Sequence, residues 1–283
     1  MFRKSIITLV VSTGALLSGF AAAAQVTEET QSDTRGRVCA EIDRSIAHGL
    51  HVQASGEFRM KDSFKSIDRI YTGLGITYKP INWLKLGLGY IWMNIDDGGV
   101  WEMRHRVNAD ATLSYRTGFW KFSLRERLQC TYRPGEMNLY QNPRMELNLR
   151  SRAKISYVFP DIPIEPFFAA ELRNTLNGTV FNAPAHSSVP GDNVSFNDVY
   201  INRLRFEPGI SWKIDARNGI DFFVLYDKTF KKKFDADKNG DLKYYKDKDG
   251  NVVYNESTGM PLFKIMYRKE NLMSFGIGYK YSF

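Results

Sequence analysis

Arginines separated by a single residue recur along this chain, and carboxylates follow the same alternating spacing. In the stretch FSLRERLQC, residues 122–130, Arg125 and Arg127 stand on either side of Glu126. Successive side chains of a β-strand point to opposite faces, so the two arginines would share one face and the glutamate would lie on the other. The planar guanidinium group pairs bidentately with carboxylates and binds phosphate in the same way. The spacing predicts a sheet face on which arginines pair with carboxylates or bind anions.

Counting by twos along the neighbouring segments adds further charged side chains to the same face. The predicted inner belt consists of Asp110, Arg125, Arg127, Arg150, Arg152, Glu171, Arg173, Arg203, Arg205 and Glu207. Pairing across the short turn TGF would set Arg125 near Asp110, and pairing across residues 133–142 would set it near Arg150. Arg150 would then lie close to Glu171 or Arg173. A register error of two residues would change these partners but not the faces.

The elements that must carry this belt are strands with one apolar face. In the last twelve residues, LMSFGIGYKYSF, apolar and aromatic side chains alternate with Ser, Gly and Lys. Apolar-out and polar-in alternation over about ten residues, with aromatics near one end, is typical of strands in outer-membrane barrels. The same alternation recurs from residue 50 onward. A strand of a soluble sandwich would also alternate, but it would seldom place paired glycines opposite such a complete aromatic row.

The connections between these segments alternate between short and long. Short turns are predicted at residues 79–82, 117–118, 159–163 and 215–219, and long loops at 95–101, 133–142, 178–197 and 229–261. Bacterial outer-membrane barrels have short periplasmic turns, long extracellular loops and an even number of strands. We predict an all-β, antiparallel transmembrane barrel of about ten strands. Residues 37–46 form a further candidate strand, which would give twelve strands if residues 263–268 also formed one.

The first residues predict export from the cytoplasm. A basic start is followed by an apolar run over residues 6–20 and by small residues that suit cleavage after Ala24. No later segment reaches the roughly eighteen apolar residues of a membrane helix. We expect a signal peptide at residues 1–24, a periplasmic segment or first strand at 25–48, and the barrel at 49–283. The predicted location is the bacterial outer membrane with both termini periplasmic, and one disulfide between Cys39 and Cys130 is an open alternative.

Two interpretations of the inner belt stay open at this stage. Charged groups inside a narrow barrel persist when they are paired and hydrogen-bonded, so the belt could be a compensated structural core. Inward cations outnumber inward carboxylates, however, and rings of Arg and Lys select anions in pores. The expected partners are outer-membrane lipid, the barrel-assembly machinery during insertion and an anionic solute. Nucleic acid is not expected, because the cations lie inside the barrel and form no surface stripe.

Glu126 does not fit strict alternation. It would face lipid near the middle of the membrane, where a carboxylate is costly. We expect a β-bulge that turns Glu126 inward, since bulges re-aim side chains in this way.

Several stretches resemble a known family. The segments WEMRHRVNADATLSYRTGFWKFSLRERLQ, PRMELNLRSRAKISY, IEPFFAAEL and INRLRFEPGI resemble a family of small Gram-negative outer-membrane barrels of unknown function. The likeness covers most of the chain after residue 24 and carries no assigned chemistry. A weaker likeness, through the arginine-rich inner face and the YSF end, is to oligogalacturonate-specific porins.

Other candidate chemistry is sparse. The opening of a calcium loop is matched by Asp235, Asp237, Asn239 and Asp241. Lys246 stands where a bidentate glutamate should complete such a loop. We therefore favour a solvated turn and expect no cofactor. No Ser-His-carboxylate triad of a barrel lipase or protease assembles by counting, so we do not expect an enzyme. The loop LKYYKDKDG supports an alternative in which the barrel binds a surface partner through its long loops.

Overall fold

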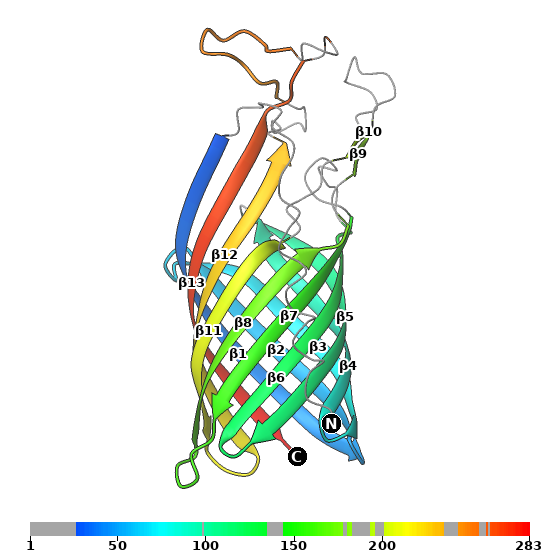
Figure 1. Cartoon of the computed structure of the whole chain (residues 1–283), viewed down its shortest axis with the longest axis vertical. Coiled ribbons are helices and arrows are strands. Elements are labelled where there is room, and N and C mark those ends of the chain that lie inside the picture. The colour runs from blue at the N-terminus through cyan, green and yellow to red at the C-terminus, as the bar shows by residue number, and fades with distance from the viewer. Residues whose placement is uncertain are drawn as a thin grey trace, which may run out of the picture.

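The protein is a closed β-barrel (Figure 1). The computed structural model describes residues 27–97, 99–134, 144–177, 180–182, 193–195, 201–234, 243–254, 259 and 261–283. No helix among these residues is long and apolar enough to cross a membrane. The predicted all-β barrel is confirmed, and its neighbouring strands are antiparallel as predicted except for one parallel pair.

Eleven strands form the barrel and two short strands pair outside it. The barrel strands are β1 (Thr27–Ala47), β2 (Leu50–Lys61), β3 (Ser66–Ile81), β4 (Leu84–Asp97), β5 (Val100–Thr117), β6 (Trp120–Tyr132), β7 (Met145–Tyr157), β8 (Ile164–Thr175), β11 (Ile201–Lys213), β12 (Asn218–Phe234) and β13 (Ile265–Ser282). The short strands are β9 (Val180–Asn182) and β10 (Asn193–Ser195).

The barrel has eleven strands, whereas we predicted about ten, with twelve as the alternative. Ten strands, β2 to β8 and β11 to β13, correspond to the predicted set, and residues 37–46 lie within β1 as the eleventh. The stretch 263–268 adds no strand of its own, because β13 begins at Ile265 and runs without a break to Ser282. When strands alternate in direction and their number is odd, the first and last strands run the same way and must pair in parallel. β1 accordingly pairs with β13 in parallel, from Thr27 opposite Met266 to Asp43 opposite Ser282.

The two ends of the barrel differ. Residues 48–49, 82–83, 118–119, 158–163 and 214–217 make short connections at the end where the C-terminus lies, and the long connections lie at the other end (Figure 1). Because β1 and β13 are parallel, Thr27 and Phe283 lie at opposite ends. We call these the short-turn end and the long-loop end.

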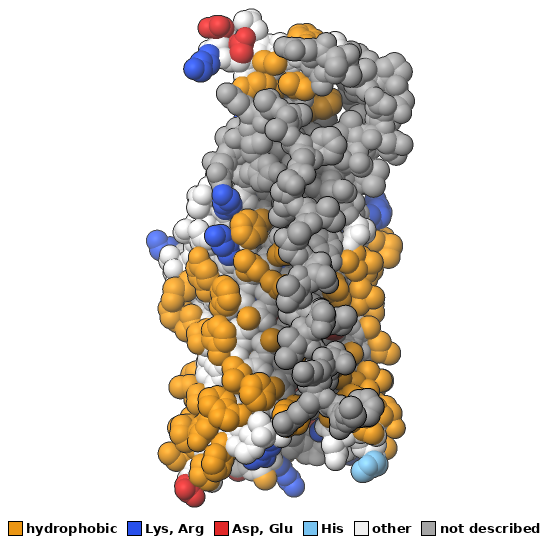
Figure 2. Space-filling view, in the orientation of Figure 1, with side chains coloured by type: hydrophobic (Ala, Val, Ile, Leu, Met, Phe, Trp, Pro, Cys, Tyr) orange, Lys and Arg blue, Asp and Glu red, His pale blue; other side chains and the backbone are white. Residues whose placement is uncertain are grey.

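The outer wall is apolar and the inside is polar. Among the described residues, fifteen buried side chains are polar or charged and only seven are hydrophobic, while large apolar side chains such as Leu74, Leu88 and Tyr115 are exposed. Figure 2 shows hydrophobic side chains over the barrel wall, with charged side chains mainly towards its ends. A small buried apolar cluster of Tyr71, Met93 and Ile95 lies near the long-loop end. Soluble proteins bury mainly apolar side chains and expose polar ones, so this distribution of side chains is the reverse of theirs.

The turn between β11 and β12 carries a pH-dependent contact. The Asp215 carboxylate accepts hydrogen bonds from the backbone N–H groups of Arg217 and Asn218, at 2.7 and 2.8 Å. These bonds lower the pKa of Asp215. The carboxylate therefore stabilises the turn above the ordinary Asp pKa of about 3.9, and this contribution is lost as the pH falls further.

Amide hydrogen exchange at Arg217 and Asn218 tests this turn. We expect protection, relative to the intrinsic exchange rate, at pH 6 and its loss as the pH falls through 4 towards 2. Asp215→Ala should remove the protection at every pH. Protection of the native turn that did not change with pH would contradict the assignment.

Candidate functional site: a charged belt inside the barrel

Glu171 on β8 is the centre of an arginine cluster. Arg150 Nη2 on β7 lies 2.8 Å from Glu171 Oε1 and 2.9 Å from Oε2. Arg203 Nη2 on β11 lies 2.8 Å from the same Oε1, and Arg125 Nη2 on β6 reaches Oε2 at 3.3 Å. The contact from β6 to β8 crosses the strand between them, so these side chains lie on the concave inner face. One buried carboxylate holds three guanidinium groups.

A second cluster lies around Asp227 and Glu57. Arg205 binds Asp227 bidentately at 2.6 and 2.7 Å, and Arg37 lies 3.7 Å from the same carboxylate. Arg37 also reaches Glu57 at 3.4 Å, and Glu57 accepts two bonds from Arg59 at 2.6 and 3.0 Å. These pairs connect β11, β12, β1 and β2 into one network.

Two further pairs lie beside the Glu171 cluster. Arg127 donates to both carboxylate oxygens of Asp110, at 2.5 and 2.7 Å. Arg152 donates to Glu207 at 2.8 Å, which joins β7 to β11 across β8. Arg173, the remaining residue of the predicted belt, donates to Asn202 at 2.5 Å. All ten predicted residues therefore have a place in this network.

The predicted partners are shifted by two residues. Asp110 lies opposite Arg127, where we expected Arg125, and Arg125 lies opposite Arg152, where we expected Arg150. For Asp110 the cause is the β5–β6 hairpin, whose two loop residues are Gly118 and Phe119, one position later than the predicted turn at 117–118. The second shift belongs to the separate β6–β7 register. Gly118 has a φ of 56°, which suits glycine in a two-residue hairpin loop. The faces are unchanged, because a shift of two preserves alternation.

The predicted belt left out five members of the network: Arg37, Glu57, Arg59, Arg106 and Asp227. Alternation puts all of them except Arg37 on the polar face of their strands, but the predicted belt did not include them. Arg37 required knowledge that β1 closes the barrel. We call these five residues and the ten predicted ones the charged belt.

The charged belt contains ten arginines and five carboxylates. Arg106 donates to the Thr131 hydroxyl at 3.1 Å and lies 5.7 Å from the Tyr71 ring centroid, and Arg173 bonds to an amide oxygen, so both contact neutral partners. The Nε–H groups of Arg125, Arg152 and Arg203 are buried and lack an acceptor within the described part of the chain. The belt therefore has surplus positive charge and free donors that an oxyanion would satisfy.

The belt is tighter on one side than on the other. The side chains of Glu171, Asp227 and Arg205 are 2%, 5% and 8% exposed, whereas Arg125 and Arg152 are 23% and 22% exposed. Arg125 and Arg152 are therefore the more accessible arginines of the belt, and Glu171, Asp227 and Arg205 are nearly closed off from solvent. Such an arrangement can hold a small anion and restrict passage of larger molecules.

Glu126 lies on the outer face, and the predicted bulge is wrong. β6 pairs without a register shift on both sides, with Glu126 opposite Ala111 and Ser151. The Ser151 hydroxyl donates to Glu126 Oε2 at 2.6 Å. A serine on the neighbouring strand thus donates a hydrogen bond to the carboxylate on the outer face, so Glu126 has a polar partner without a bulge that turns it inward.

The other sequence candidates form no second site within the part of the chain that the structure describes. Cys39 on β1 and Cys130 on β6 are free thiols. The calcium candidates Asp235, Asp237, Asn239 and Asp241 lie outside the described residues. Within the described ranges, no group of three or more His, Cys, Asp or Glu is placed to hold a metal ion. His51 Nδ1 lies 2.8 Å from Asp43 Oδ1 at the short-turn end.

Fold and belt together define a closed β-barrel with an apolar outer wall and an ion-paired interior. A family model described as "Protein of unknown function (DUF2490)" matches residues 39–238, and the chain belongs to that family. The match spans β2 to β12 and the last part of β1, from Cys39 to Ala47, and it confirms the resemblance to an uncharacterised family. No curated protein matches the chain significantly.

Proposed function

We propose that this protein is an integral barrel of the bacterial outer membrane whose charged belt binds and passes small anions. The exposed apolar side chains of the outer wall and the alternation of short turns with long loops support the membrane location. On this basis the short-turn end, with Phe283, faces the periplasm, and the long-loop end faces the outside. Thr27 lies at the long-loop end, which differs from the predicted arrangement with both termini in the periplasm.

The observation that supports anion binding is the excess of arginine over carboxylate in the belt. Five carboxylates of the belt hold the arginines in fixed positions, and Glu146 outside the belt is within electrostatic reach of Arg106 and Arg173. The remaining surplus of arginine leaves positive charge for mobile anions to balance. Burying uncompensated charge is costly, so bound anions stabilise such an interior. Rings of arginine and lysine in anion pores work in this way.

The size of the interior restricts the solute. Eight-stranded barrels are filled by side chains, whereas porins of about sixteen strands leave a wide aqueous channel. An eleven-strand barrel lies between these limits, and the nearly buried Glu171, Asp227 and Arg205 fill part of it. The solute is therefore a small inorganic or carboxylate anion.

Single-channel recording with Arg125→Gln tests the proposal. Arg125 is suited to this test because Arg150 and Arg203 keep Glu171 paired when it is removed. We expect the native protein in a planar bilayer to carry an anion current that falls several-fold in Arg125→Gln. The control is Arg217→Gln, the same charge change at a turn of the short-turn end, which should leave the current unchanged. Absence of any current from correctly folded native protein would contradict anion passage.

A further inference from the structure

Two cavities meet at the short-turn end of the barrel. One is a groove of about 610 Å³ over the outer face of β5 to β8, and the other is a polar cavity of about 640 Å³. Both are lined by Trp83, Ser114, Tyr115, Phe122, Ser123 and Lys154. The two spaces therefore adjoin along shared residues.

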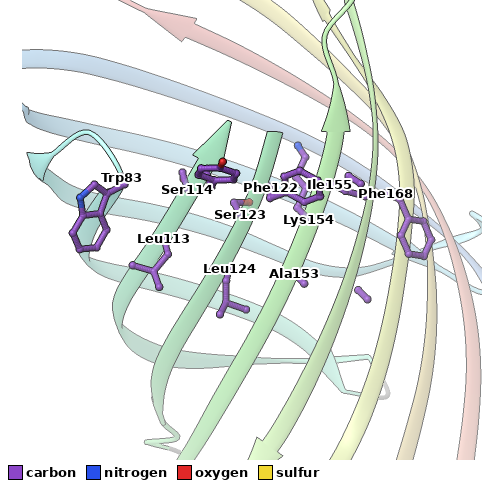
Figure 3. Close-up of a pocket in the computed structure, with 12 residues that line it drawn as sticks. Trp83, Leu113, Ser114, Phe122, Ser123, Leu124, Ala153, Lys154, Ile155 and Phe168 are labelled. Atoms are coloured by element: carbon purple, nitrogen blue, oxygen red, sulfur yellow. The ribbon is translucent and has the colours of Figure 1, made fainter. Parts of the chain in front are cut away.

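The groove is apolar and has a floor of small side chains. Leu124, Ala153 and Ala170 lie opposite one another on β6, β7 and β8. Figure 3 shows Leu113, Leu124 and Ala153 side by side on neighbouring strands, with Trp83 at one end and Phe168 at the other. Alanine at two adjacent positions between larger apolar side chains leaves a hollow in the wall. Its apolar lining suits an acyl chain.

The strand register explains why the groove adjoins the polar cavity. β4 begins at Leu84 opposite Leu113, and a hydrogen bond of 2.8 Å from Ser114 N to Trp83 O extends the pairing by one step. Tyr115 and Arg116 of β5 continue beyond that point without a β4 partner. The wall is thus notched beside the β3–β4 turn, and the notch joins the inner side to the outer side.

The polar cavity is basic. Lys121 is neutralised by Glu165 at 2.6 Å, whereas Lys154 lies 3.7 Å from the Phe167 ring centroid and Arg116 Nε donates to the Gly118 carbonyl at 3.2 Å. Among the described residues, no carboxylate lies within ion-pair distance of Lys79, Arg116 or Lys154. Three cations and the hydroxyl groups of Ser114 and Ser123 thus line a cavity beside an apolar groove.

We propose that this notch binds an anionic phospholipid, with its phosphate in the basic cavity and one acyl chain in the outer groove. The apolar groove complements a hydrocarbon chain, and the three cations complement the negatively charged phosphodiester of a lipid whose headgroup carries no cation. Trp83 at the junction fits the headgroup level, where tryptophan is enriched in membrane proteins. This inference rests on the membrane location in the proposed function but not on anion passage.

Native mass spectrometry of the full chain released from detergent micelles tests the site. We expect phosphatidylglycerol to be retained in preference to phosphatidylcholine with identical chains. Arg116→Gln and Lys154→Gln should each weaken retention roughly fivefold, since one cation near a membrane surface contributes about that factor. Ala153→Phe, which fills the groove, should also weaken it. Lys213→Gln is the control, because this lysine lies at the same end on β11 but lines neither cavity.

Three results would overturn the lipid site. They are equal retention of the two lipids, unchanged retention in all three site variants, and full displacement of the lipid by inorganic phosphate, which would indicate a free-anion site. Flotation of the protein with lipid vesicles separates this failure from that of the membrane location. Protein that does not float contradicts both proposals, whereas protein that floats without headgroup preference contradicts the lipid site alone. Anion conductance is measured separately, in the planar bilayer.

Discussion

Glu171→Gln is expected to destabilise the barrel by about 3–5 kcal/mol, the usual cost of breaking a buried ion pair by removing one partner. The substitution keeps the shape of the side chain but removes the charge that Arg125, Arg150 and Arg203 share. Three guanidinium groups would then stand together in the interior without a carboxylate between them. Urea unfolding in detergent micelles, followed by tryptophan fluorescence, measures the change in the free energy of unfolding.

Glu41→Gln is the matched control. Glu41 pairs with Lys280 at 2.7 Å, but their side chains are 38% and 49% exposed. An exposed pair contributes about 0–1 kcal/mol, so this variant should unfold almost as the native protein does. An equal decrease in the free energy of unfolding in the two variants would show that the Glu171 cluster contributes no more to stability than an exposed ion pair.

The Glu171→Gln variant also reports on anion binding. An anion that binds the folded barrel and not the unfolded chain stabilises it in proportion to the logarithm of its concentration. Phosphate should therefore restore more stability to Glu171→Gln than to the native protein, because the variant leaves an additional cation unbalanced. Sulfate would act by exclusion from the surface as well, so phosphate at low millimolar concentration is the better probe.

Gly209→Val is expected to cost about 1–3 kcal/mol through overpacking. A Cβ at Gly209 on β11 would lie 2.4 Å from Phe167 Cζ and 2.7 Å from the backbone oxygen of Phe222. The ring could move, but the strand backbone cannot yield without breaking its ladder. The same urea titration measures the loss.

Gly56→Val on β2 is the control for this substitution. A Cβ at Gly56 has nothing within 4 Å in the described structure, so valine fits and its strand preference is satisfied. We expect no loss of stability. A native-like Gly209→Val barrel would contradict the close packing of Phe167 against the β11 backbone.

The sequence predicted the faces of the strands well and their partners less well. Alternation identified the inward direction of every residue in the predicted belt, because a period of two survives any even register error. It placed the β5–β6 turn one residue too early, and that single step changed the partner of Asp110 from Arg125 to Arg127. It also could not show that β1 pairs with β13 in parallel, since the polar start of β1 has little alternation of its own.

Glu126 shows a different limit. Alternation placed it correctly on the outer wall, and a general rule about carboxylates in lipid led us to prefer a bulge. The rule fails here because Ser151 on the next strand donates a hydrogen bond to Glu126, and only the β6–β7 register shows that the two residues are neighbours. The strand pattern was a better guide here than the energetic expectation.

The ionic interior is itself informative about function. Replacing a buried ionic network by apolar side chains of similar volume is often neutral or stabilising, so stability alone does not require ten arginines inside a barrel. Arginine in surplus over carboxylate instead suits a site that exchanges anions with solvent. The more exposed Arg125 and Arg152 would meet the anion first, before the closed part of the belt.

The zero-current potential of the native protein across a chloride gradient tests anion passage most directly. With potassium chloride more concentrated on one side of a planar bilayer, an anion-selective barrel gives a potential whose sign is that of the chloride equilibrium potential. We predict this sign, with a magnitude that falls in Arg125→Gln. A potential of the opposite sign, set by potassium, would contradict selection of anions by the charged belt.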